Sequence, residues 1–367
     1  MENGVDPTQS PSQPPSSEDT VDLLKPVNGE DAVEEDQVMS EVHLGCPPGL
    51  SGPHVSHFTI CFPREVEPSR YRDFLEDGEN STNQMIGVDE DGDLVLPRRS
   101  KLASPSCIVS IQHNVTSSIP RVGLQVWRAE LALSDFVLHK VLNSSEFHGV
   151  VAIELGAGTG LVGMLLALVA NTVFLTDHGD EILDNCSRNV QLNSGLFNSQ
   201  AAVHVRELDW FNPWPPRVSE GCPPLKKRYS WTFTEVEEAQ KASLLMAADV
   251  IYSDDLTDAF FSVLERLMSR DSRKVLYLSF EKRYNFSLDD LDVVANGYSH
   301  FRSYLQDGMK NNNLKSGSHP CFVGKQIDIA QIPQYVREYD RGDDVEIWEI
   351  KYCTPKQSSN SDTMTAE

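Results

Sequence analysis

The chain has 367 residues and a formal net charge of −24, from 31 basic and 55 acidic residues. Its 40% hydrophobic content suffices for one domain of about 200–250 residues with appended segments. A surface this acidic repels phosphate backbones, so we expect no stable nucleic-acid binding through a basic face. A basic protein partner fits the sign of the charge better, although acidity also serves solubility alone.

The seven cysteines are scattered, and the chain has no C-x-x-C pair and no cluster of histidines. This argues against a structural zinc site and a disulfide framework, and it fits a reducing compartment. The acidic, polar N-terminus does not resemble a signal peptide, and no apolar run approaches the roughly 18 residues that span a bilayer. We expect an intracellular protein of the nucleus or cytosol, with no membrane segment and no metal.

Residues 1–50 contain eleven acidic residues and one basic residue, Lys25, with many Ser and Pro and no aromatic residue. Such a segment buries too little apolar surface to offset its ordering entropy, so disorder is predicted for residues 1–50 and likewise for residues 354–367. Residues 51–121 hold short β-type runs at 57–62, 93–96 and 107–112, separated by turn residues. They predict a small, β-rich, antiparallel N-terminal extension.

From residue 122 the pattern changes to alternating strands and helices. Strands are predicted at 150–155, 171–177, 201–206, 243–251, 274–280, 298–305 and 345–352, and helices at 124–142, 161–170, 180–193, 256–268 and 287–296. This alternation predicts an α/β domain over residues 122–353, with a seven-stranded, Rossmann-like sheet covered on both faces. The sheet is expected to be mostly parallel, with an antiparallel last strand.

Two segments interrupt this pattern, a Pro- and Trp-rich stretch at 211–241 and a polar, Gly- and Asn-rich stretch at 306–333. Both follow strands, where ligand-binding loops gather in open α/β sheets. The basic clusters at 98–101 and 226–228 have the composition of nuclear-import signals, but we favour solvated loops for both.

The most informative motif is a short apolar strand that runs into three glycines, Gly156, Gly158 and Gly160, and then into an apolar helix. Glycine permits the sharp turn and keeps side chains out of the path of a ligand that lies across it. The helix N-terminus adds free N–H groups and a positive dipole end. Loops of this kind bind S-adenosylmethionine or a dinucleotide.

Residues 158–163 also fit the dinucleotide pattern G-x-G-x-x-G, and Asp177 ends the next strand as a ribose-binding acid would. However, the turn opens at Gly156, so its third glycine comes two residues after the second rather than three. Glu154, just before the first glycine, repels a pyrophosphate but attracts a cationic sulfonium. We therefore favour S-adenosylmethionine over a dinucleotide.

Three further side chains follow the next two strands. Asp177 has two oxygens that can accept both ribose hydroxyls, although a terminal Asp is also a common helix N-cap. Asp209 can accept the exocyclic amine of adenine, and Trp210 can flank the ring. Packing beside the Pro-rich loop explains Trp210 equally well.

These residues occur in the order of a known family. The chain contains Gln-Val-Trp at 125–127, Glu-Leu-Gly-Ala-Gly-Thr-Gly at 154–160, Thr-Asp at 176–177, Asn-x-x-x-Asn at 189–193, Leu-Asp-Trp at 208–210 and Asp-Val-Ile-Tyr at 249–252. Together they resemble the family 16 methyltransferases, seven-β-strand enzymes most of whose characterised members methylate protein lysines. The resemblance covers residues 122–352, and the acidic extension and the 211–241 insertion depart from its compact members.

The resemblance implies S-adenosylmethionine as the cofactor and a protein as the substrate. It implies a cofactor site formed by Trp127, Glu154, Gly156, Gly158, Gly160, Asp177, Asp209, Trp210 and Ala248. It further implies that Asp249 and Tyr252 face the point where the acceptor amine meets the methyl group, although Tyr252 is also explained by packing at a strand end.

Two other functions compete with lysine methylation. A methyltransferase of adenine or glutamine is expected to carry Asn/Asp-Pro-Pro-Tyr/Phe after the fourth strand, and the segment Asp249–Tyr252 lacks the prolines. Other small-molecule or nucleic-acid acceptors remain open. A non-catalytic binding module is disfavoured, because the glycine loop is intact.

Overall fold

A computed structural model describes residues 37–43, 52–63, 105–216, 218, 228–269, 273–287, 292–306 and 322–353. The principal helices are α1 (Arg128–Asn143), α2 (Leu161–Leu166), α3 (Asp180–Leu192), α4 (Phe233–Gln240), α5 (Asp254–Met268) and α6 (Asn296–Ser303). The predicted runs at 93–96 and 98–101, and the tail at 354–367, lie outside the described residues. None of the described helices is both long enough and apolar enough to cross a membrane.

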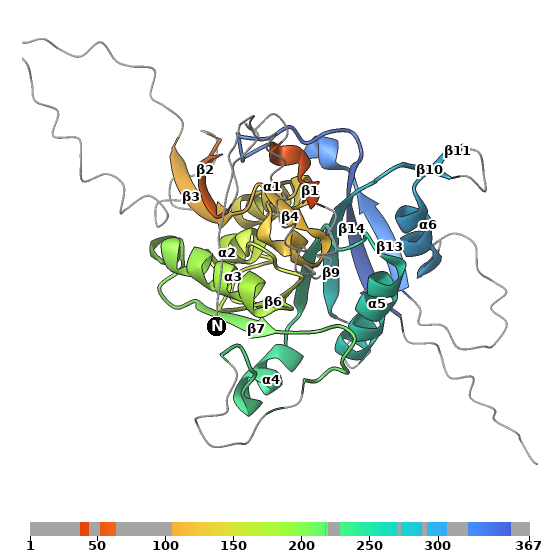
Figure 1. Cartoon of the computed structure of the whole chain (residues 1–367). Helices are drawn as coiled ribbons and strands as arrows, with labels where there is room; N and C mark the ends of the chain where they lie inside the picture. The colour runs from red at the N-terminus through yellow and green to blue at the C-terminus, as the bar shows by residue number, and fades with distance from the viewer. Residues whose placement is uncertain are drawn as a thin grey trace, which may run out of the picture. The chain divides into compact units, whose positions relative to one another are not determined.

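The central sheet has the strand order β12-β13-β14-β9-β8-β5-β6-β7 (Figure 1). Its strands are β5 (Val151–Leu155), β6 (Thr172–Asp177), β7 (Ala202–Glu207), β8 (Leu244–Ala248), β9 (Val275–Glu281), β12 (Leu305–Gln306), β13 (Phe322–Ile327) and β14 (Val345–Tyr352). Strands β7, β6, β5, β8 and β9 are parallel, and β14 is antiparallel to both of its neighbours. This confirms the predicted α/β class and the antiparallel last strand, with the two-residue β12 as an additional edge.

Alternate residues of these strands face two separate cores. Ala152, Val173 and Met246 pack with α1, α2 and α3, whereas Ile153 and Leu245 pack with α4, α5 and α6. Figure 1 shows α1, α2 and α3 on one side of the sheet and α5 and α6 on the other. A sheet covered on both faces accounts for the nearly continuous apolar runs in its central strands.

Two segments near the C-terminal side of the domain differ from prediction. Residues 298–305 were expected to form a strand, but most of them belong to α6, which buries Phe301 completely, and only Leu305 is in a strand, β12. Residues 287–296, expected to form a helix, instead contain β11 (Asp292–Val294), which pairs with β10 (Asn285–Ser287). The sixth full strand, β13, comes from the stretch at 306–333 that was read as an insertion.

The N-terminal part of the chain packs on the α1–α3 side as an antiparallel pair, β2 (His54–Cys61) and β3 (Ser106–His113). The predicted antiparallel extension is therefore present. Its buried side chains Phe58, Ile60, Val109 and Ile111 join the same core as α1 and α2. The extension thus belongs to the hydrophobic core of the sheet domain.

An asparagine ladder on α3 covers the free edge of β3. Asn189 and Asn193 stand one helical turn apart, and their side-chain amides pair with the backbone of Gln112 and Ser110. Each amide accepts from the backbone N–H at 2.7–2.9 Å and donates to the carbonyl of the same residue at 2.8–3.0 Å. The ladder gives an exposed sheet edge the hydrogen bonds that a neighbouring strand would supply.

The connection between β13 and β14 is anchored on α1 by Asp135. This fully buried carboxylate accepts backbone N–H groups of Tyr335 and Val336 through Oδ1, at 2.8 and 2.9 Å. Its Oδ2 accepts the Tyr339 hydroxyl at 2.5 Å and the Arg341 guanidinium at 2.6 Å. The same connection pairs with β2, because the backbone N–H of Cys61 donates to the Tyr335 carbonyl at 2.9 Å.

Part of the segment predicted to lack structure is ordered against the domain. β1 (Gln37–Met39) pairs with β4 (Thr116–Ser118), and a 3₁₀ turn follows at Glu41–His43. Ser40 is buried, its N–H donates to Gln125 Oε1 at 2.7 Å, and its hydroxyl donates to the Val126 carbonyl at 2.5 Å. Two short polar bonds and a strand pairing hold this segment despite its low hydrophobicity. The other residues of 1–50 lie outside the described part of the chain.

Candidate active site

A cavity of about 400 Å³ opens at the carboxyl ends of β5, β6 and β8. In the sheet, β5 lies between β6, the next strand in the chain, and β8, which begins the other half of the sheet. The cavity is therefore at the point where the strand order reverses, which is where open α/β sheets bind ligands. Of the residues predicted for the site, those that line it are Trp127, Glu154, Gly156, Gly158, Asp177, Asp209, Trp210, Ala248, Asp249 and Tyr252. Gly160 is not among the lining residues. It is the N-cap of α2, with a φ of 84°.

The glycine loop forms one wall of the cavity. Gly158 has a φ of 50°, and its N–H donates to Asp177 Oδ2 at 2.7 Å, which ties the loop to the end of β6. A Cβ at Gly158 would lie 3.0 Å from the Gly123 carbonyl oxygen. Both the backbone conformation and the close approach require glycine at this position.

Three carboxylates with raised pKa values surround the loop. Glu154 is 1% exposed, and its Oε2 accepts the Gly163 N–H at 2.8 Å. Glu130, from the first turn of α1, accepts the Thr159 hydroxyl at 2.5 Å. Burial raises the pKa of Glu154 well above its ordinary value, raises that of Glu130 to about 7, and also raises that of Asp177. A bound cation would lower these pKa values, so the wall favours a cationic ligand.

No Lys or Arg is found among the described residues that line the cavity. A pyrophosphate in this position would meet carboxylates and no basic side chain, which disfavours a dinucleotide. A sulfonium and an ammonium group would instead be attracted. The donor set therefore fits S-adenosylmethionine. Among the described residues, no group of His, Cys, Asp and Glu side chains could hold a metal ion.

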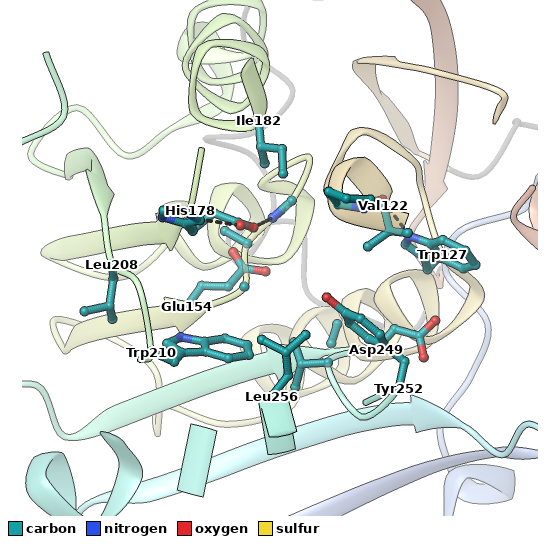
Figure 2. Close-up of a pocket in the computed structure, with 18 of the residues that line it drawn as sticks. Val122, Trp127, Glu154, His178, Ile182, Leu208, Trp210, Asp249, Tyr252 and Leu256 are labelled. Carbon is teal, nitrogen blue, oxygen red and sulfur yellow. Dashed lines mark hydrogen bonds between the residues drawn. The ribbon is translucent and has the colours of Figure 1, made fainter. Parts of the chain in front are cut away.

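Trp210 and Asp209 form one end of the cavity. In Figure 2, Trp210 and Leu208 lie across the cavity from Trp127, Asp249 and Tyr252, with Glu154 between the two groups. The Trp210 ring packs on Phe260, at 5.1 Å between centroids, and its buried Nε1 has no partner among the described atoms. Asp209 accepts the Phe211 N–H at 3.0 Å and the Asn212 amide at 2.7 Å, so it also caps its own turn.

Trp127, Asp249 and Tyr252 form the opposite end. Asp249 has a φ of 55°, a conformation uncommon for residues other than glycine, and its N–H donates to the Ser279 carbonyl at 2.7 Å. Backbone strain of this kind concentrates at functional sites. Tyr252 is 42% exposed as a residue, yet desolvation of its hydroxyl, with the charges of Asp177 and Asp249, raises its pKa to about 12. Its phenol is therefore protonated at neutral pH and can donate a hydrogen bond.

Sequence reasoning missed two charged residues of this site. Glu130 lines the cavity from a helix predicted only as an apolar element, and the available signal was a carboxylate one turn after Trp127 on an otherwise apolar face. Arg283 follows β9 and forms a bidentate pair with Asp249, at 3.1 and 2.5 Å. Nothing in the local pattern at 282–284 marks Arg283, because its partner is more than thirty positions away.

Known proteins share sequence with this chain. The family model described as "Lysine methyltransferase" matches residues 105–223. "Methyltransferase-like protein 22" from Homo sapiens is 34% identical over 316 residues, covering 75% of this chain and 74% of that protein. "Protein N-lysine methyltransferase METTL21A" from Danio rerio is 30% identical over 195 residues, covering 52% of this chain and 77% of that protein.

The matched region includes the glycine loop and the carboxylates that surround it, and the similarity to Methyltransferase-like protein 22 extends over three quarters of the chain. The resemblance seen in the sequence is confirmed. The cofactor is S-adenosylmethionine, and the matching family is described as lysine methyltransferases. The chain belongs to the lysine methyltransferase family.

Proposed function

We propose that the two ends of the cavity divide the reaction between them. The end at Asp177, Asp209 and Trp210 holds the adenosine of S-adenosylmethionine, and the end at Asp249 and Tyr252 receives the acceptor lysine. The two ends of the cavity have different side chains, and this difference supports the division. One end has the glycine loop and the indole N–H of Trp210, which has no partner among the described atoms. The other end has the rings of Trp127 and Tyr252 and the carboxylate of Asp249, whose backbone is strained.

At the adenosine end, Asp177 would accept the ribose hydroxyls with the lone pairs left by Gly158 and His178. Trp210 would lie against the adenine, and Ala248 would border the adenosyl group. Glu154 and Glu130 would hold the negative potential that attracts the ammonium and sulfonium groups. Bound there, the cofactor supplies an electrophilic methyl group.

At the acceptor end, the chain must provide a neutral amine. At pH 7, a lysine with a pKa near 10.4 requires about 4–5 kcal/mol to lose its proton. The walls formed by Trp127 and Tyr252 would desolvate the ammonium, which lowers that cost. The Tyr252 hydroxyl remains protonated, so it does not take the proton of the ammonium, which would leave to solvent water. Its oxygen would accept an N–H of the amine, which leaves the nitrogen lone pair free to attack the methyl group. Asp249 would align the amine toward the cofactor.

The acceptor is proposed to present its lysine on a basic surface. The lining of the cavity includes two exposed apolar side chains, Ile119 at 50% and Phe211 at 66%. The chain as a whole has a net charge of −24, so a basic protein is attracted over a long range at low salt. We place the reaction in the nucleus or cytosol, in keeping with the scattered cysteines.

The function is tested by incubating the purified protein with radiolabelled S-adenosylmethionine and cell lysate, followed by mass-spectrometric mapping of the labelled residue. The expected result is N-methyllysine in one or a few proteins. Gly158→Arg is the matched negative control, because its side chain would enter the cavity from the loop. Label on nucleic acid, on a small molecule or on another amino acid would overturn the proposed acceptor, even if the cofactor is consumed.

A further inference from the structure

Arg283 contacts the Asp249 carboxylate and the Trp127 ring, the two groups that would bind an acceptor ammonium. Its Nη1 and Nη2 donate to Oδ1 and Oδ2 of Asp249 at 3.1 and 2.5 Å. Its guanidinium carbon lies 5.0 Å from the centroid of the Trp127 ring, within the range of a cation–π interaction. Asp249 Oδ1 additionally accepts the Glu281 N–H at 3.4 Å. Both oxygens of Asp249 are therefore engaged by the chain itself.

Two other carboxylates whose charges act on Arg283 have an oxygen atom without a partner among the described residues. Glu281 is 8% exposed, and its Oε1 pairs with Arg128, but its Oε2 is buried and unbonded within the described part of the chain. Glu41 Oε2, from the 3₁₀ turn after β1, is likewise buried and has no hydrogen-bond partner among the described residues. A buried acceptor without a donor costs about 1–3 kcal/mol and calls for an explanation.

Electrostatics link these carboxylates to Arg283. Burial lowers the pKa of Arg283, but the charge and hydrogen bonds of Asp249 and the charges of Glu41 and Glu281 together outweigh burial, so that the pKa is raised. Burial raises the pKa of Glu281, and the charge of Glu41 raises it further. The charges of Glu41 and Glu281 thus oppose each other, and a guanidinium hydrogen-bonded to their unpartnered Oε2 atoms would stabilise both carboxylates.

We propose that Arg283 is an internal stand-in for the acceptor lysine, displaced from Asp249 when the acceptor binds and received by the free Oε2 atoms of Glu41 and Glu281. The inference rests on the proposed function, because it assigns Asp249 to the acceptor end. An acceptor without a positive charge cannot replace the guanidinium on Asp249. Arg283 and Glu41 then determine specificity for a cationic side chain, and the N-terminal segment contributes to the site.

The position of Arg283 can be followed directly by ¹⁵N NMR of its guanidinium in the full chain, with the resonance assigned by Arg283→Lys. The probe is n-butylammonium chloride, which carries the end of a lysine side chain, at constant ionic strength. n-Butanol is the neutral control. We expect a saturable shift with n-butylammonium and none with n-butanol. An unmoved resonance, or equal responses to both probes, would overturn the proposal.

Two variants separate displacement from general attraction. In Asp249→Asn, Arg283 should already give the displaced resonance and respond no further. Glu41→Gln, which is isosteric, should weaken the apparent n-butylammonium affinity severalfold, whereas the exposed Glu237→Gln removes the same charge elsewhere and should leave it unchanged. Equal affinity in Glu41→Gln and the parent chain would contradict the role of Glu41.

A kinetic cycle with the mapped acceptor gives an independent readout. Glu41→Gln should raise KM for the acceptor with little change in kcat, and this effect should disappear in the Arg283→Met background, where no guanidinium needs to be received. If Glu41 only attracts the substrate, the effect persists in that background. Should lysine methylation proceed normally while the Arg283 resonance stays fixed, this inference fails and the proposed function stands.

Discussion

The side-chain amide of Asn189 pairs with both backbone groups of Gln112, accepting from its N–H at 2.7 Å and donating to its carbonyl at 3.0 Å. It also donates to the Thr159 carbonyl at 3.0 Å, in the turn that leads to α2. One buried amide therefore joins the N-terminal extension, α3 and the end of the glycine loop. The Asn-x-x-x-Asn motif of the sequence is explained by this ladder and not by contact with a ligand.

Asn189→Ala should destabilise the fold by about 2–4 kcal/mol, because it leaves buried backbone groups of Gln112 without partners. Urea unfolding measures the change. Gln191→Ala, an exposed position on the same helix, is the control and should lie within about 0.5 kcal/mol of the parent chain. If the two variants unfold at the same urea concentration, the ladder does not hold the extension.

Glu130→Gln should stabilise the cofactor-free protein at high pH. The pKa of Glu130 is raised from 4.5 to about 7, so its contribution to stability is fully present below about pH 4.5 and is lost as pH rises to 7. Above pH 7 the buried charge costs on the order of 3 kcal/mol. Glutamine keeps the bond from Thr159 and removes that charge.

Thermal unfolding at pH 5 and pH 8 tests this assignment. The melting temperature of Glu130→Gln should exceed that of the parent chain at pH 8 and differ little at pH 5, whereas its affinity for S-adenosylmethionine should fall. Glu237→Gln should show neither change. A gain of equal size at both pH values would mean that Glu130 does not carry the titrating charge.

Two truncations test the order of the N-terminal segment. Removal of residues 1–36 leaves every described contact, so the melting temperature should be unchanged within error. Removal of residues 1–43 eliminates β1 and the Ser40 bonds to Gln125 and Val126, and it should lower the melting temperature by several degrees. Identical melting temperatures for the two chains would show that this segment does not pack on the domain.

Asp249→Asn should lower the rate of methyl transfer by about 10²–10⁴-fold, since it removes the charge that aligns the amine. Asparagine tolerates the positive φ of this position, so backbone strain should not increase. Tyr252→Phe should cost less if the ring serves only as a wall. The comparison requires cofactor affinity in the same preparations, which both variants should retain. Parent-level methylation by Asp249→Asn would remove Asp249 from the reaction.

Much of this architecture follows from the sequence. The apolar runs predicted the strands of the sheet, and the three glycines predicted the loop and most of the cavity. Both could be predicted because they depend on local periodicity and on a local turn. The Asp249–Arg283 pair, the Asp135 anchor and the order of residues 37–43 were not predictable, because each depends on partners distant in the chain. The strand predicted at 298–305 is wrong for most of its length, because residues 296–303 form α6 and bury Phe301.

The carboxylate-lined cavity is expected to bind S-adenosylmethionine across the glycine loop, and calorimetric titration tests this binding most directly. The parent chain should bind S-adenosylmethionine and S-adenosylhomocysteine, and it should bind neither NAD nor NADP. Gly158→Arg should bind none of the four while Glu237→Gln behaves as the parent chain. Tight binding of NAD without a response to S-adenosylhomocysteine would show that the cavity is a dinucleotide site.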